Sequence, residues 1–266
     1  MSKATVIRNL IREFGFIDGI RIVYWYINEK FNLKNIEGIK TIHGKFLGGG
    51  QIYIRPNTTD LILLLEFFGK YADDQGNRVY QIAFERNADD VKYIIDCGAN
   101  IGLFSLIYAQ KYPEAKIIAV EPEQQNYKML CMNIKNHKNI TAIRNGVWNQ
   151  GIDLKIIARD TGAYGFMVQE CKDGQGDVRG VSIGDLMEKY GFPRVDILKM
   201  DIEGSELEVI TCDADEWLNK TNILILETHE RIKPGSEKLI ENALLKNNHY
   251  MEGESNGENR IFYRVV

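Results

Sequence analysis

A carboxylate and two glycines follow an apolar segment at a spacing that suits a bound cation. Residues 93–102 read as a strand that runs into a turn and then a helix, and the turn has the form Asp96-x-Gly98-x-Asn100-x-Gly102. Glycines at these places let the backbone approach a ligand at the N-terminus of the helix. Because a carboxylate precedes the first glycine, the turn suits a cationic ligand better than a pyrophosphate.

The same turn does not fit the dinucleotide-binding fingerprint. That motif needs glycine at its first, third and sixth positions, which here hold Gly98, Asn100 and Leu103. A nicotinamide-dependent oxidoreductase is therefore disfavoured, and preferential binding of NAD would revive it.

A second carboxylate stands at the end of the next predicted strand. The strand expected over residues 116–120 ends in Glu121-Pro122. An acidic group in this place can accept hydrogen bonds from both hydroxyls of a ribose. Alone, such a residue is more often a solvated turn or a helix cap. Together with the glycine turn, it favours a ligand that contains a nucleoside.

A sheet must hold these groups at one edge. From residue 91 onward, predicted strands alternate with helices, which predicts a mostly parallel sheet covered on both faces, with ligands beyond the carboxyl ends of the strands. The expected strands are 91–95, 116–120, 140–144, 152–158, 195–200 and 223–226, and the expected later helices are one capped by Ser182, 205–210 and 237–247. Asn256-Gly257 predicts a hairpin that makes the last strand antiparallel. The stretch 160–180 predicts a loop or a hairpin insertion.

The first 90 residues have a different character. Residues 3–31 predict a helix broken by Gly15 and Gly19, and 61–68 predict a second helix with an N-cap at Thr58-Thr59-Asp60. We expect a helical segment over 1–90 that lids the site, and a ligand-binding domain over 91–266.

The apolar run 22–27 lies beside several arginines and is too short to cross a membrane. Packing against the main domain is its commonest explanation. The alternatives for residues 1–30 are a homodimer face or a peripheral membrane contact.

Composition excludes several classes. The formal net charge is −4, with 33 Lys and Arg against 37 Asp and Glu, and no Asn-Pro-Pro-aromatic motif is present, so a nucleic acid is not the expected partner. Four cysteines without CxxC spacing argue against a zinc cage and fit reduced thiols in a cytoplasmic protein. We expect neither a signal peptide nor a transmembrane segment.

The combination of motifs resembles the class I S-adenosylmethionine (SAM) dependent methyltransferases, and more narrowly the FkbM family. The segments that carry this resemblance are 96–102, Ser105, Glu121-Pro122, Asn145-Gly146-Val147, 196–206 and Leu226-Glu227-Thr228-His229, with the less distinctive 55–60 upstream. The likeness spans roughly residues 50–230. It departs from the family at Cys97, where an aliphatic residue is usual, and at Trp148, where a smaller one is common.

The resemblance implies a Rossmann-like sheet of seven strands and a SAM site whose product is S-adenosylhomocysteine (SAH). The residues implied to hold SAM are Asp96, Gly98, Ala99, Asn100 and Gly102 along methionine and ribose, Glu121 with Pro122 at the ribose hydroxyls, Asn145 and Val147 beside the adenine, and Asp201 near the sulfonium methyl.

Methyl transfer to a hydroxyl needs in-line placement of the acceptor oxygen and gains from a base that takes its proton. His229, just after a buried strand, is the first candidate for that base and Glu203 is the second; Glu206 is expected to be a helix-start charge. Asp201, Glu227 and His229 could gather Mg²⁺, but spacing alone does not show that they converge, so we expect no metal.

The leading hypothesis is a SAM-dependent O-methyltransferase that acts on a small or glycan acceptor, expected to be a sugar in polysaccharide biosynthesis, and the sugar rests on family analogy. The alternative from another class is a catalytically silent SAM-binding protein with 1–90 as an interaction surface. Retained SAM affinity without transfer to any acceptor would favour it.

Overall fold

The computed structural model describes residues 3–70, 91–158, 165–246, 250–256 and 259–265. Its centre is a seven-stranded sheet with the order β12-β13-β11-β10-β3-β4-β5. The strands are β3 (Tyr93–Cys97), β4 (Lys116–Val120), β5 (Ile140–Ile143), β10 (Val195–Met200), β11 (Thr221–Glu227), β12 (Tyr250–Asn256) and β13 (Asn259–Arg264). β13 pairs antiparallel with both of its neighbours, and the pairs from β11 to β5 are parallel. The expected fold class, including the antiparallel final strand, is confirmed.

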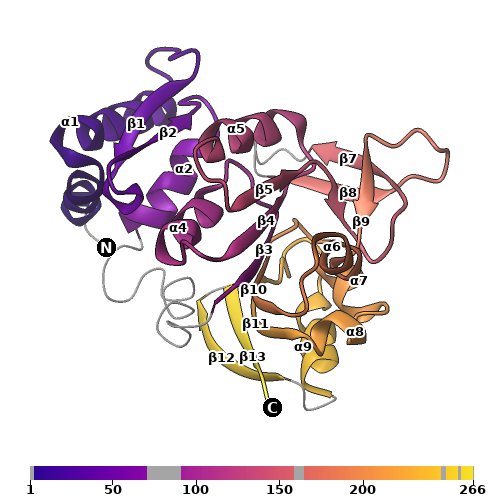
Figure 1. Ribbon diagram of the computed structural model, residues 1–266. Helices are drawn as coiled ribbons and strands as arrows, with labels where there is room; N and C mark the ends of the chain where they lie inside the picture. The colour runs from indigo at the N-terminus through magenta and orange to yellow at the C-terminus, as the bar shows by residue number, and fades with distance from the viewer. Residues whose placement is uncertain (1–2, 71–90, 159–164, 247–249, 257–258, 266) are drawn as a thin grey trace.

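Helices cover both faces of this sheet (Figure 1). One apolar core joins the sheet to α4 (Leu103–Lys111) and α5 (Gln124–Ile134). A second core, on the other face, joins it to α6 (Ile183–Tyr190), α7 (Glu206–Thr211), α8 (Asp215–Leu218) and α9 (Ser236–Lys246). Every residue of β10 is buried, as expected for a central parallel strand between two helix layers.

A smaller sheet extends from the end of β5. It has the order β6-β9-β7-β8, with β6 (Gly146–Val147), β7 (Asp153–Ala158), β8 (Phe166–Glu170) and β9 (Val178–Val181). The insertion expected at 160–180 is therefore largely a hairpin of β7 and β8 followed by β9, although 159–164 lie outside the described residues. Ser182 caps α6 in a capping box with Asp185, as predicted.

The N-terminal segment is a compact layer outside α4 and α5 (Figure 1). It comprises α1 (Lys3–Phe31), β1 (Lys40–Gly44), the 3₁₀ turn η1 (Lys45–Leu47), β2 (Gly50–Ile54), α2 (Asp60–Leu64) and the π-helical turn η2 (Leu65–Lys70). Its core includes Ile101, Leu103 and Met129 of the main domain. It is packed against that domain, and its expected role as a lid stays a prediction.

The two glycines of α1 do different things. Gly15 has φ 73° and ψ 171° and breaks the helix, as predicted. Gly19 does not break it. A Cβ on Gly19 would lie 2.8 Å from the Cα of Ile11, so this glycine lets the two halves of α1 touch.

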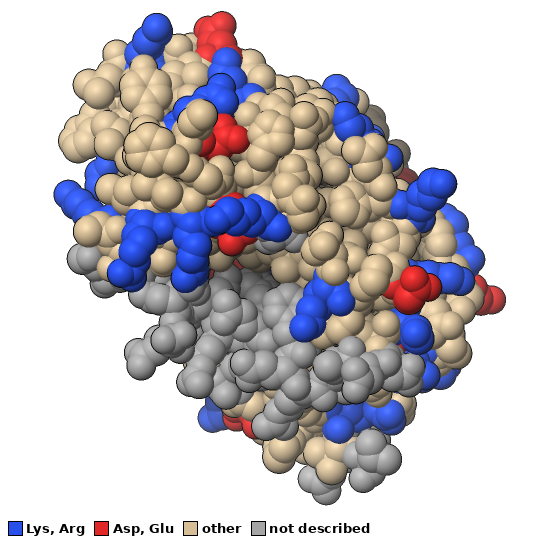
Figure 2. Space-filling view, turned by 60° about the vertical axis from the view of Figure 1, so that its left-hand side comes forward, with Lys and Arg blue, Asp and Glu red and all other residues tan. Residues whose placement is uncertain are grey.

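The second half of α1 is apolar on two sides. Ile22 and Trp25 are buried, whereas an outward stripe is exposed to solvent; the stripe comprises Phe16, Ile17, Ile20, Tyr24, Ile27 and Phe31. Figure 2 brings this side of the molecule forward and shows basic side chains around largely uncharged surface. A dimer face or a membrane contact here stays a prediction. Within the described ranges, no helix combines the length and apolar character that a bilayer crossing needs.

Thr59 is the N-cap residue of α2, within the predicted segment 58–60, but its side chain makes no capping bond. The Thr58 hydroxyl accepts from the backbone N–H of Asp60 at 3.3 Å. The Asp60 side chain turns back to Arg55, whose Nη2 and Nε lie 2.7 Å and 3.0 Å from its two oxygens. Arg55 also donates to Asn126 of α5 at 2.8 Å. The hydrogen bond from Arg55 to Asn126 ties the N-terminal segment to the main domain.

Asn133 of α5 makes a second tie. Its side chain accepts from the backbone N–H of Tyr53 at 2.7 Å and donates to the carbonyls of Tyr53 and Ile101 at 3.1 Å and 2.8 Å. One amide thus joins β2 to the turn that follows β3.

Arg55→Ala tests the first tie. Asp60 is completely buried, and a buried charge that loses its partner costs about 3–5 kcal/mol, so we expect a fall of about 3 kcal/mol in the free energy of unfolding, measured in urea. The control is Arg179→Ala, because the Arg179–Asp153 pair is exposed and its loss should cost less than about 1 kcal/mol. Equal stability of the two variants would contradict this account.

Candidate functional site

Four strands end together at the edge where the predicted residues lie. Cys97 pairs with Val120 on one side and with Met200 on the other, and Met200 pairs with Leu226. The residues that follow these positions therefore share one edge of the sheet, as predicted for a parallel α/β fold.

Gly98 holds the turn after β3 against the tip of β10. It has φ 76°, and a Cβ there would lie 1.7 Å from the carbonyl oxygen of Asp201, so only glycine fits. The N–H groups of Gly98 and Ala99 both donate to the carbonyl of Val120. Gly102, with φ 88°, is limited in the same way by the side chain of Leu130.

Asp96 lies below this turn. Its side chain is completely buried, accepts from the Ser105 hydroxyl at 2.6 Å and lies 3.5 Å from Nζ of Lys199. Burial raises the pKa of Asp96, and the charge of Lys199 only partly opposes the shift. The resemblance placed Asp96 along SAM; in the structure this carboxylate has no exposed surface and supports the turn from beneath.

Lys199 is the functional residue that the sequence reasoning missed. Its ammonium donates to the carbonyl of Gly98 at 3.0 Å and lies 3.3 Å from Asp201, in addition to its contact with Asp96. The available signal was a lysine inside the apolar strand 195–200, because a buried lysine requires partners.

Glu121 reaches across to the turn after β3. It is 4% exposed and accepts from the backbone N–H of Asn100 at 2.8 Å and from that of Glu123 at 2.9 Å. Burial outweighs these hydrogen bonds and raises the pKa of Glu121 to about 7. The structure thus brings Glu121 into contact with the glycine turn, the two features that the sequence analysis combined. Pro122 directly follows Glu121.

Of the residues predicted beside the adenine, Asn145 lies on the connection from β5 to β6 and Val147 lies in β6. The Asn145 amide donates to the carbonyl of Arg179 at 2.9 Å, and Val147 is 3% exposed in the core that joins the sheet to α6–α9. Their assignment to the adenine stays a prediction.

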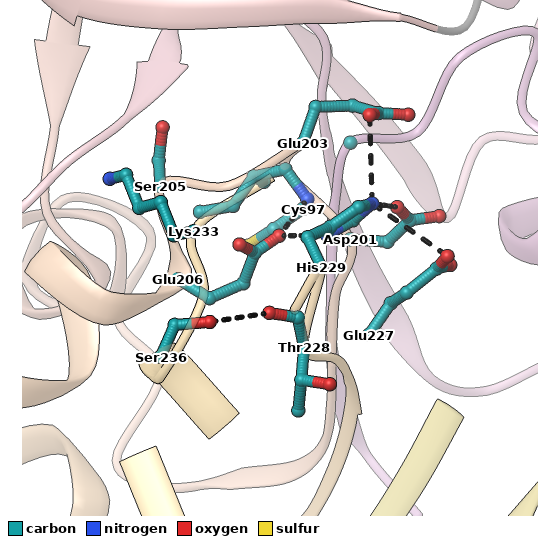
Figure 3. Close-up of polar contacts among 12 residues, drawn as sticks. Cys97, Asp201, Glu203, Ser205, Glu206, Glu227, Thr228, His229, Lys233 and Ser236 are labelled. Atoms are coloured by element: carbon teal, nitrogen blue, oxygen red, sulfur yellow. Dashed lines mark hydrogen bonds and ion pairs between the residues drawn. The ribbon is translucent and has the colours of Figure 1, made fainter. Parts of the chain in front are cut away.

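His229 and four carboxylates meet at the tips of β10 and β11 (Figure 3). Nδ1 of His229 lies 2.8 Å from Glu206, and Nε2 lies 3.6–3.7 Å from oxygens of Asp201, Glu203 and Glu227. Both candidate bases, His229 and Glu203, are therefore in one cluster. Their backbones have φ 46° and φ 56°, which is uncommon for side-chain-bearing residues and frequent at functional sites.

Glu206 is the first residue of α7, as expected of a helix-start charge, and it also belongs to this cluster. It is 1% exposed and accepts from the N–H of Ile202 at 2.9 Å as well as from His229. The sequence could not show this, because His229 is far along the chain.

Burial and mutual repulsion govern protonation in the cluster. Burial raises the pKa of Glu203 to about 7 and, with the charge of Asp201, that of Glu227 to about 8. Burial lowers the pKa of His229, but the hydrogen bond and charge of Glu206, with the other carboxylates, raise it to about 10.

The sequence left open whether a set of metal ligands converges, and the structure shows that it does. One ligand atom each from Asp201, Glu227 and His229 lies within 4.8 Å of the others.

Comparison with known families agrees with this geometry. The family described as "Methyltransferase FkbM domain" matches residues 96–250, more than half of the chain. The chain belongs to the FkbM methyltransferase family. It is a SAM-dependent methyltransferase, and its Rossmann-like sheet is the one the resemblance implied.

Several curated methyltransferases are similar to this family member. "Methyltransferase sdnD" of Sordaria araneosa is 30% identical over 61% of this chain and 75% of its own length. "Hexuronic acid methyltransferase AglP" of Haloferax volcanii is 28% identical over 60% of this chain and 65% of its own. "Methyltransferase 1" of Beauveria bassiana is 27% identical over 51% and 64%. The chain covers less than two thirds of the last two proteins.

Lys199→Met tests the buried contact beneath the site. It leaves Asp96 without a cation, so we expect a loss of about 3–5 kcal/mol in the free energy of unfolding, measured in urea. Adding Asp96→Asn removes the unpaired charge and should restore part of the loss.

The control for this test is Lys220→Met, whose pair with Glu216 is solvent-exposed and should contribute less than about 1 kcal/mol. If the double variant were no more stable than Lys199→Met, the two charges would not depend on each other.

Proposed function

We propose that this methyltransferase transfers a methyl group to a hydroxyl of a glycan or other small acceptor, with a sugar as the acceptor. The observation that carries the proposal is the position of the acidic cluster at β10 and β11, directly beside the turn after β3. The sugar is supported by the similar protein named as a hexuronic acid methyltransferase.

The residues at the edge of the sheet fit SAM. Glu121 offers a carboxylate for the ribose hydroxyls, and the buried Oδ1 of Asn100 has no partner within the described protein. Gly98, Ala99 and Gly102 bring backbone close to the same place. Asp201 would lie near the sulfonium, while Asp96 acts through the turn that it supports.

When bound, SAM supplies a methyl group that the acceptor oxygen displaces in line, leaving SAH. The chain contributes a base. Glu203 suits this role better than His229, because its side chain is 14% exposed whereas that of His229 is 1% exposed. A base must reach the proton that it removes. Glu203 therefore takes the hydroxyl proton, and His229 helps to fix the position of the surrounding carboxylates.

The presence of a base at the site also indicates that the acceptor is a hydroxyl and not a carboxylate. A carboxylate is already ionised near neutral pH and needs no proton removed, whereas a sugar hydroxyl does.

A cytoplasmic location and a place in polysaccharide biosynthesis belong to the same proposal. The location is supported by the four cysteines, all of which are free.

Glu121 should make SAH binding depend on pH. Only the ionised carboxylate accepts from both ribose hydroxyls, so affinity should increase as pH rises through the pKa of about 7. By calorimetry, we expect about tenfold tighter SAH binding at about pH 8 than at about pH 6. Binding of NAD in place of SAH would contradict the cofactor assignment.

The matched variants are Glu121→Gln and Glu114→Gln. The first should weaken SAH binding by about 10-fold to 100-fold, since hydrogen bonds to a charged group contribute about 1.5–3 kcal/mol, and should abolish the pH dependence. Glu114 is exposed at the opposite end of the sheet, so its variant should behave as wild type. An unchanged pH profile in Glu121→Gln would remove the ribose assignment.

The acceptor chemistry can be tested with methyl-labelled SAM and oligosaccharides that contain hexuronic acids. Label that survives alkali marks a methyl ether on a hydroxyl, whereas alkali-labile label marks an ester. We expect alkali-stable label, and Glu203→Gln should lower kcat by about 100-fold while leaving SAH affinity unchanged.

Glu216→Gln is the control, because Glu216 is exposed on α8 and pairs with Lys220. Alkali-labile product would refute the hydroxyl assignment, and unchanged kcat in Glu203→Gln would refute its role as base. SAH binding with no transfer to any acceptor would favour a catalytically silent SAM-binding protein.

A further inference from the structure

The imidazole of His229 turns an unpartnered nitrogen toward three carboxylates (Figure 3). Nε2 is buried and has no hydrogen-bond partner among the described residues. It lies 3.6–3.7 Å from oxygens of Asp201, Glu203 and Glu227, too far for hydrogen bonds. The separations are close to those between donors that share one ion, about 3.0–3.5 Å when each bond is about 2.1 Å.

The other ring nitrogen sets the tautomer. Nδ1 lies 2.8 Å from Oε1 of Glu206, which is itself 1% exposed. An ionised carboxylate only accepts, so Nδ1 carries the proton and donates it to Glu206. A cation that replaces a proton at Nε2 would meet the lone pair of the neutral ring there. A carboxylate behind the histidine is the usual support of a metal ligand.

The cluster also has an excess of negative charge. Besides the three carboxylates around Nε2, Glu206 faces the same ring. Lys199 divides its charge between Asp201 and Asp96, at 3.3 Å and 3.5 Å. Arg231 is half exposed and approaches Glu203 only to 3.9 Å. Carboxylates gathered around Nε2 require a cation among them, which is either a proton on the ring or a metal ion.

We propose that Asp201, Glu227 and His229 bind a divalent cation, through one oxygen of each carboxylate and Nε2. Oδ1 of Asp201 faces Nε2, while its Oδ2 contacts Lys199. One nitrogen and two oxygens suit an ion that accepts both donor types, such as Mn²⁺. The proposal departs from the metal-free site expected from spacing alone.

The site leaves room for an acceptor. The side chains of Asp201 and Glu227 are 28% and 22% exposed, so the side of the ion away from His229 is open. The catalytic part of this inference rests on the proposed function. An ion there binds the acceptor hydroxyl oxygen and lowers its pKa, and the proton passes to Glu203.

The test is titration of EDTA-treated full-length protein with Mn²⁺, followed by electron paramagnetic resonance of the free ion and by thermal unfolding. We expect one bound Mn²⁺ per chain and a higher Tm when it is present. Glu227→Gln and His229→Gln should each weaken binding by about tenfold or more and remove the rise in Tm.

Glu227→Gln is decisive, because this partly exposed side chain can be replaced without emptying the core; Glu216→Gln is the control. Absence of Mn²⁺ binding, or equal binding in Glu227→Gln, would overturn the site and leave a protonated His229 to balance the charge.

SAH calorimetry and methyl transfer, each with and without Mn²⁺, separate this inference from the proposed function. Specific Mn²⁺ binding without SAH binding or transfer would keep the metal site and refute the function. Unchanged methyl transfer by protein that binds no Mn²⁺ would refute the metal site and keep the proposed function.

Discussion

A buried ammonium group connects the two strands on which the rest of the site depends. Lys199 is 4% exposed and contacts the Gly98 carbonyl and the carboxylates of Asp96 and Asp201. Loss of Lys199 or of Asp96 would leave the other buried charge without this partner, which is unfavourable in the protein interior. The Asp201 carbonyl, in turn, occupies the space that a side chain at position 98 would fill. The turn after β3 and the tip of β10 therefore form one unit, and the proposed cofactor and acceptor sides of the site are positioned by the same contacts.

The positions of the strands along the chain were predictable because they depend on short-range patterns. Apolar runs separated by helical spacing predicted β3, β4 and β10, and the local pair Ser182 and Asp185 determined a capping box. The direction of a side chain was not predictable in the same way. Asp96 has the expected spacing from the glycines, yet it turns inward because Ser105 and Lys199 provide its partners there. Spacing along the chain does not show which side of a turn a carboxylate occupies.

Long-range convergence was the other limit. Each member of the acidic cluster stands at a strand end or a helix start, where a solvated charge is ordinary. Glu206 and His229 meet only because the start of α7 packs beneath the loop that follows β11. The same applies to Gly19, which looks like a helix breaker in sequence and is a point of close contact in three dimensions. Such roles depend on partners that come from elsewhere in the chain.

The two ties from the N-terminal segment have a consequence for how the chain can be divided. The family match covers 96–250, but the core of the N-terminal segment includes Ile101 and Met129, and β13 lies between β11 and β12 beyond the end of that match. A fragment with the bounds of the match would expose the apolar surface of α4 and α5, cut into β3, and lose β13 and nearly all of β12, so that β11 would have no neighbour on that side. The family match and the packed structure thus have different limits in this protein: the residues proposed for methyl transfer lie within the shorter stretch, but some of the elements that keep them in place do not.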